Sequence, residues 1–175
     1  MKHITHKLIM LLFMLMTACG ASAQKGFFGS ISRSKGVEYF YTAGVNRNNP
    51  NLKKGVPRIK GIDVEYLVSH LSSIEMVSAT RPEKGDDMTG ELEKSVMSTI
   101  KEKDFETLYE ISTDEQELTV YAQADKYNGY RIVITQLVKN EPQRYLAVLY
   151  RCMNFDIDKL FTDSQGDAQG EEPAS

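Results

Sequence analysis

Few side chains in this sequence have the type and spacing that chemistry requires. Beyond residue 23 the sequence contains one histidine, His70, and one cysteine, Cys152. A zinc site built on several histidines or on a CxxC pair has no ligand set here, so we predict no metal and no cofactor. His70 is close in sequence to Ser69 and Ser72. Neighbours on one helix do not form a nucleophile site with an orienting carboxylate, so we predict no catalytic residue there.

Other chemistry-bearing patterns are equally weak. Asp125-Lys126-Tyr127-Asn128-Gly129 lacks the repeated oxygen ligands of a calcium loop and is predicted to be a turn. No phosphate-cradling glycine loop or nucleophile-elbow pattern occurs. Acidic side chains gather near one end of the predicted sheet, as in any soluble domain with this many acids: Glu106, Glu110, Asp114, Glu115 and Glu117. A small periplasmic hydrolase with an unrecognised site therefore stays the alternative to a non-enzymatic protein.

The first 23 residues have the composition of an export signal. Lys2 and Lys7 precede an apolar run over residues 8–16. Ala21-Ser22-Ala23 then forms a cleavage pattern before Gln24. Leu15-Met16-Thr17-Ala18-Cys19 also approximates a lipobox, in which Cys19 becomes acylated. The first interpretation predicts a periplasmic protein and the second a lipid-anchored one.

The remainder is predicted to be one domain with a net negative charge. Cleavage after residue 23 removes two lysines and no acid, so the formal net charge changes from −3 to −5. This balance argues against nucleic-acid binding. We assign residues 24–35 to a Gly- and Ser-rich linker whose Phe27-Phe28 pair can pack onto the domain, residues 36–162 to the domain, and residues 163–175 to a disordered acidic tail.

Hydrophobic periodicity sets the predicted elements. Residues 37–43 and 73–79 are predicted to be strands. A first helix, with Asp63 near its start, has an apolar stripe formed by Val64, Leu67, Val68 and Leu71. A second helix buries one apolar face and is capped by Asp86 or Asp87; that face is Met88, Leu92, Val96, Met97 and Ile100. Four strands follow, at residues 105–112, 116–124, 130–139 and 144–153, with a short helix at 156–161. The sequence predicts an α+β, two-layer sandwich in β-α-β-α-β-β-β-β order, with a mostly antiparallel sheet and both helices on one face.

A long loop at residues 44–61 is locally basic on an acidic protein. It contains no acidic residue, and its cations are Arg47, Lys53, Lys54, Arg58 and Lys60. Such a run is either a solvated loop or a contact for an anionic ligand, a phospholipid headgroup or an acidic partner.

Turn chemistry suggests a register for the last four strands. Pairing Ser112 with Glu117, Ala124 with Tyr130, and Lys139 with Arg144 gives one consistent apolar face. The opposite face then carries an apolar patch that is either covered by the chain itself or available to a partner: Leu137, Leu146, Val148 and Tyr150.

The layout resembles the DUF4252 family of exported Bacteroidetes proteins. The resemblance rests on a signal ending in Ala-Gln, a Gly-Val-Glu-Tyr-Phe-Tyr strand, a helix leading into Leu-Ser-Ser-Ile-Glu-Met-Val-Ser, a second helix before Lys-Asp-Phe-Glu-Thr-Leu-Tyr-Glu-Ile, and three further strands. It implies an envelope protein of unknown function, sometimes a lipoprotein, with a link to envelope-stress sensing. It brings no catalytic residues. We therefore expect a non-enzymatic binding or accessory module whose partner is an envelope protein or a small anionic ligand.

Overall fold

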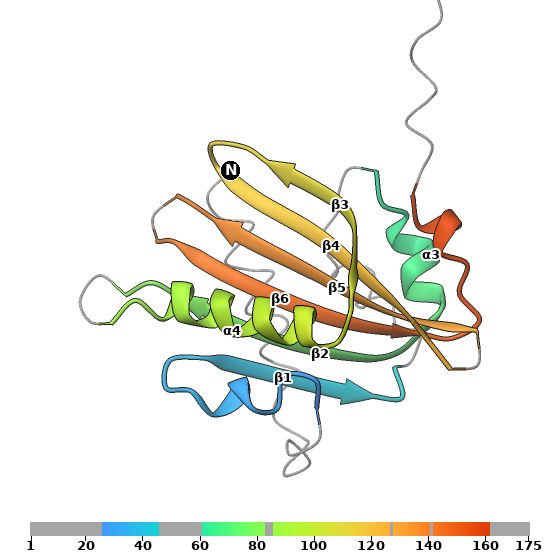
Figure 1. The fold of residues 1–175 in the computed structure, drawn as a ribbon, viewed down its shortest axis with the longest axis horizontal. Coiled ribbons are helices and arrows are strands. Elements are labelled where there is room, and N and C mark those ends of the chain that lie inside the picture. The colour runs from blue at the N-terminus through green and yellow to red at the C-terminus, as the bar shows by residue number, and fades with distance from the viewer. Residues whose placement is uncertain (1–25, 46–60, 83–85, 127, 141, 162–175) are drawn as a thin grey trace, which may run out of the picture.

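The described part of the chain forms one antiparallel sheet of six strands. The computed structural model describes residues 26–45, 61–82, 86–126, 128–140 and 142–161. Within them the strands are arranged in the order β1-β2-β6-β5-β4-β3 (Figure 1). The predicted α+β class is confirmed. The elements are η2 (Ile31–Arg33), β1 (Glu38–Ala43), α3 (Val64–Ser69), β2 (Leu71–Thr80), α4 (Met88–Glu102), β3 (Glu106–Ser112), β4 (Gln116–Asp125), β5 (Gly129–Val138), β6 (Arg144–Cys152) and η3 (Ile157–Leu160).

Helices α3 and α4 begin at the aspartates that the sequence indicates. The Asp63 carboxylate accepts a hydrogen bond from the Tyr66 backbone N–H at 2.8 Å, and the Asp87 carboxylate accepts one from the Thr89 N–H at 3.0 Å. These caps satisfy donors that a helix start leaves unpaired. Helix α3 is shorter than predicted, because the chain already enters β2 at Leu71.

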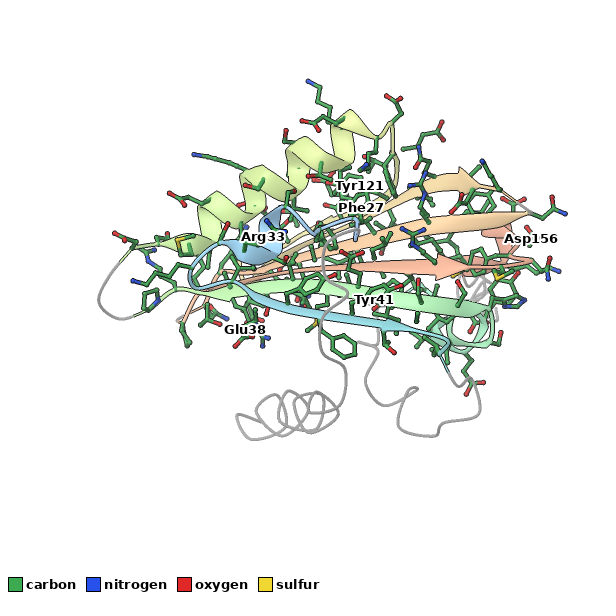
Figure 2. The ribbon with its side chains drawn as sticks, turned by 90° about the horizontal axis from the view of Figure 1, so that it is seen from below. Phe27, Arg33, Glu38, Tyr41, Tyr121 and Asp156 are labelled. Carbon is green, nitrogen blue, oxygen red and sulfur yellow. The ribbon has the colours of Figure 1, made fainter. Side chains whose placement is uncertain are left out.

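One face of the sheet packs against α4 and the segment before β1. Leu92, Val96 and Ile100 of α4 are buried, whereas Met97, predicted on the same face, is 39% exposed. The α4-side cluster joins these side chains to Phe27, Phe28, Ile31, Val77, Ala79, Tyr121, Val133, Tyr145, Ala147 and Leu149. Figure 2 shows Phe27 and Tyr121 on this side of the sheet. Phe27, Phe28 and Ile31, from the segment predicted to be a linker, are thus part of the core, with the aromatic pair packed as the sequence allows.

The other face packs against α3 and η3. Leu67 and Val68 of α3 and Leu160 of η3 belong to a second cluster that includes Ile132, Ile134, Val148 and Tyr150 of the sheet. Ile132 and Ile134 alternate along β5 with Val133 of the first cluster, so the two clusters lie on opposite faces. The prediction that both helices share one face is therefore wrong. The sheet is apolar on both faces, and each face needs its own cover.

Two of the three predicted registers are confirmed. Ser112 lies opposite Glu117, and Ala124 lies opposite Tyr130. In the third pair the register is shifted by one residue, because Val138 rather than Lys139 lies opposite Arg144. The Lys139 N–H instead donates to the Glu115 carbonyl at 2.8 Å, which draws Lys139 toward the β3–β4 turn.

Candidate binding surfaces

Glu75 is the chemically most unusual side chain in the described part of the chain. It lies in the middle of β2 and is only 2% exposed. Its carboxylate accepts hydrogen bonds from the backbone N–H groups of Phe27 at 2.8 Å and Phe28 at 2.7 Å, and from the Tyr39 hydroxyl at 3.2 Å. We call this group of contacts the Glu75 clasp. A buried carboxylate requires such donors, because it cannot keep its hydration shell.

The clasp positions the N-terminal segment on the sheet. Phe27 and Phe28 make an edge-on ring contact with centroids 4.8 Å apart, and Phe27 makes another with Phe105 at 5.4 Å. Gly26 passes so close to the carboxylate that a side chain at this position would collide with Glu75 and Tyr39. Burial and the negative charge of Glu75 both raise the pKa of the Tyr39 hydroxyl, so Tyr39 stays a hydrogen-bond donor. Glu75 therefore serves as an anchor, with its oxygens engaged by the chain itself.

Sequence reasoning missed the Glu75 clasp. The available signal was a carboxylate in the middle of an apolar strand, at a position that alternation places on a buried face. What the sequence could not supply was the pair of N–H donors, which come from residues 47 and 48 positions away.

His70 is the C-cap of α3 and belongs to an aromatic cluster. Its Nδ1 lies 2.9 Å from the Tyr66 carbonyl oxygen and 2.8 Å from the Ser69 hydroxyl. The carbonyl can only accept, so Nδ1 carries the proton, and the Ser69 hydroxyl itself donates to Tyr66 O at 2.7 Å. Nδ1 cannot then take a proton from Ser69. The His70 ring also packs against Tyr66 and Phe155, at centroid distances of 4.4 and 5.7 Å. These contacts favour a structural role.

A hollow of about 560 Å³ lies between the β4–β5 turn and η3. Asp125, Asp156 and Asp158 are among its lining residues. Asp125 pairs with Arg131 at 3.6 Å, and Asp156 caps η3 by accepting the Asp158 N–H at 3.2 Å. Two of the three acids are thus committed to local structure. Within the described residues no three His, Cys, Asp or Glu side chains form a group that could hold a metal ion.

The predicted apolar patch does not exist as one surface. Because β6 is shifted by one residue, Leu137 lies opposite Tyr145 and packs on the α4-side cluster, whereas Leu146 lies opposite Gln136 on the other face. Val148 and Tyr150 are also on the α3 side, where they are 7% and 2% exposed. The prediction of a joint interface is wrong, since these side chains form parts of two separate cores.

The other predicted binding residues lie outside the described part of the chain. This holds for Cys19 and for all five cations of the basic loop, Arg47, Lys53, Lys54, Arg58 and Lys60. Described residues on both sides of the loop are held by backbone hydrogen bonds. The N–H groups of Gly44 and Val45 donate to the Ser72 carbonyl at 3.0 and 3.4 Å, and the Asp63 N–H donates to Leu160 O at 2.8 Å. Val45 and Ile62 both pack on the α3 side of the sheet.

The fold is thus an α+β domain whose antiparallel sheet is covered on both faces. No protein-family model, curated protein or solved structure matches this chain. Among the helices of the described residues, none is both long and apolar enough to cross a membrane.

Proposed function

We propose that this protein is an exported, non-enzymatic binding or accessory module of the bacterial envelope. The observation that carries the proposal is the Glu75 clasp. Glu75, a carboxylate in the middle of strand β2, is buried and accepts hydrogen bonds from two backbone N–H groups and a hydroxyl. A general base needs a free lone pair within reach of a substrate proton, and this carboxylate uses its lone pairs to hold the fold together.

The proposed contact for the partner is the basic loop. The described residues on either side of it, Gly44, Val45 and Asp63, are held by hydrogen bonds to Ser72 of β2 and Leu160 of η3, and binding residues are commonly carried by segments that a rigid scaffold positions. Five cations without an intervening acid suit an acidic envelope protein or a small anionic ligand. The resemblance to the DUF4252 family supports the envelope setting and the link to stress sensing. Export follows from the leader, with Cys19 acylated or removed.

The test begins with the intact mass of the protein from soluble and membrane fractions. A mass that begins at Gln24 supports periplasmic export, an acylated Cys19 supports anchoring, and an unprocessed chain would refute export. Partners are then captured by cross-linking in cells that express Lys53→Glu/Lys54→Glu. The matched control is Lys94→Glu/Lys101→Glu on α4, where both lysines are exposed. Loss of the partner in the loop variant alone supports the proposal. Equal capture of the partner by both variants would refute the proposed contact through the loop.

A further inference from the structure

Among the described residues, strand β1 has no pairing strand on one of its edges. It pairs with β2 on one side and forms the outer strand of the sheet (Figure 1). The Gly44 N–H bonds Ser72 O at 3.0 Å, in register with the β1–β2 ladder, so residues 38, 40 and 42 also bond toward β2. The backbone N–H and C=O groups of Tyr39, Tyr41 and Ala43 therefore point outward. No hydrogen bond joins them to another described residue.

The opposite edge of the sheet is protected. Strand β3 has a register irregularity between Thr107 and Tyr109, which interrupts a regular row of donors and acceptors. It also carries the exposed carboxylates of Glu106 and Glu110. Bulges and charges are the devices by which proteins prevent edge strands from pairing. Strand β1 has a regular ladder, one charged residue at its start, and Tyr41, which is 40% exposed. The β3 edge is therefore protected against pairing with another strand, and the β1 edge is not.

We propose that the β1 edge is an interface with a second copy of this chain, which adds its own β1 in antiparallel orientation about a two-fold axis at Tyr41. In that register Tyr41 of each copy exchanges two hydrogen bonds with the other. Tyr39 lies opposite Ala43 and exchanges two more at each end. The two sheets join into one of twelve strands, twice the six of one copy.

The sequence of β1 is complementary to itself in this register. The large side chains of Tyr39 and Phe40 lie opposite the small Ala43 and Thr42, and Glu38, the strand's only charge, lies opposite Gly44. No two like charges face each other, which would oppose pairing. With one open edge per copy the pairing closes at two copies. An open edge on each side of the sheet would instead give a filament.

Disulfide trapping in the envelope tests both the edge and the register. In a Tyr41→Cys variant the two new cysteines lie directly opposite, with Cα atoms about 5.5 Å apart, within the range for a disulfide. In an Ala43→Cys variant they lie four residues apart along the strand, roughly 13 Å. Cys152 is buried and does not compete. We expect a disulfide-linked dimer on non-reducing gels for Tyr41→Cys and none for Ala43→Cys or the wild type. The reverse pattern, or no cross-link in either variant, would overturn the proposal.

Sedimentation equilibrium of the exported, purified protein provides the second test. The wild type should be dimeric, and Tyr41→Lys, which places two ammonium groups opposite each other, should weaken the dimer at least about tenfold. Thr107→Lys on β3 is the control and should leave the dimer unchanged. Circular dichroism of each variant verifies that it is folded. A monomeric wild type, as expected if β1 pairs with a strand of another protein, overturns the proposal, as does a dimer that Tyr41→Lys leaves intact.

Discussion

Replacing Glu75 by glutamine should release the N-terminal segment while the rest of the sheet stays folded. The carboxylate accepts two charge-assisted bonds from backbone N–H groups, at 2.8 and 2.7 Å. A glutamine offers one acceptor oxygen, and its amide group would face the second N–H. Leaving a buried donor unpaired costs about 1–3 kcal/mol, partly offset because no charge is buried any longer. We expect Glu75→Gln to weaken segment docking by about 2 kcal/mol.

Limited trypsin cleavage after Arg33 measures this docking. Arg33 is exposed on η2, within the segment that the Glu75 clasp holds, and it is labelled in Figure 2. When a segment opens and closes faster than it is cut, the cleavage rate follows the open population. A loss of 2 kcal/mol corresponds to about a 30-fold faster cleavage. Tyrosine fluorescence during urea unfolding reports the stability of the remaining sheet in the same samples.

Two further variants separate the clasp from general destabilisation. Glu38→Gln removes a charge from exposed Glu38, which accepts one bond from the Ser78 hydroxyl at 3.0 Å, and should change cleavage little. Phe28→Ala removes a fully buried ring and should accelerate cleavage strongly in the wild type. In the Glu75→Gln background its effect should shrink, because the Phe28 ring and the carboxylate hold the same segment and their contributions are coupled. If Glu75→Gln cleaves at the wild-type rate while Phe28→Ala cleaves faster, the carboxylate does not hold the segment.

Three other substitutions probe the packing. Burial and, next, the charge of Glu117 raise the pKa of Glu93 in the folded protein above its value in the unfolded chain. The folded state therefore tolerates the protonated carboxyl better than the carboxylate, and stability is lost as the pH rises through the raised pKa. Glu93→Gln should therefore raise the melting temperature at about pH 7 and lose this advantage below about pH 4, as thermal scans across pH would show. A Cβ at Gly129 would lie 2.6 Å from the Cys152 carbonyl oxygen, so Gly129→Ala should destabilise by about 1–3 kcal/mol in urea unfolding. Gly90→Ala on α4, where a Cβ meets nothing within 4 Å, should instead stabilise by up to about 1 kcal/mol.

The sequence predicts the elements of this fold better than their assembly. Helix starts at Asp63 and Asp87 and the β4–β5 register depend on local chemistry, namely caps and one tight turn, and they are confirmed. The β5–β6 register depends on Lys139, whose N–H bonds Glu115 O and whose ammonium group bonds Thr113 O at 2.9 Å. That contact joins separate turns, so no local pattern reveals it.

The same limit applies to the faces of the sheet. Alternation along β5 places the Val133 side chain on one face of the sheet and those of Ile132 and Ile134 on the other, and all three are apolar. The pattern therefore indicates two buried faces but does not say which helix covers which. The Glu75 clasp combines both problems, since its donors are remote in sequence and are backbone groups that any residue would carry.

The Glu75 clasp and the β1 edge are parts of one structural arrangement. Tyr41 is the direct cross-strand partner of Glu75, and Tyr39 on the same strand donates its hydroxyl to the Glu75 carboxylate. The N-terminal segment thus fixes one end of β1 from the α4 side, where Tyr39 is half-buried, while Tyr41 stays exposed. A strand held on one edge by β2 and on one face by the clasp has lost most of its freedom before a second copy arrives. Pre-ordering of this kind lowers the entropy that pairing must overcome, and a short edge strand can then form a specific interface.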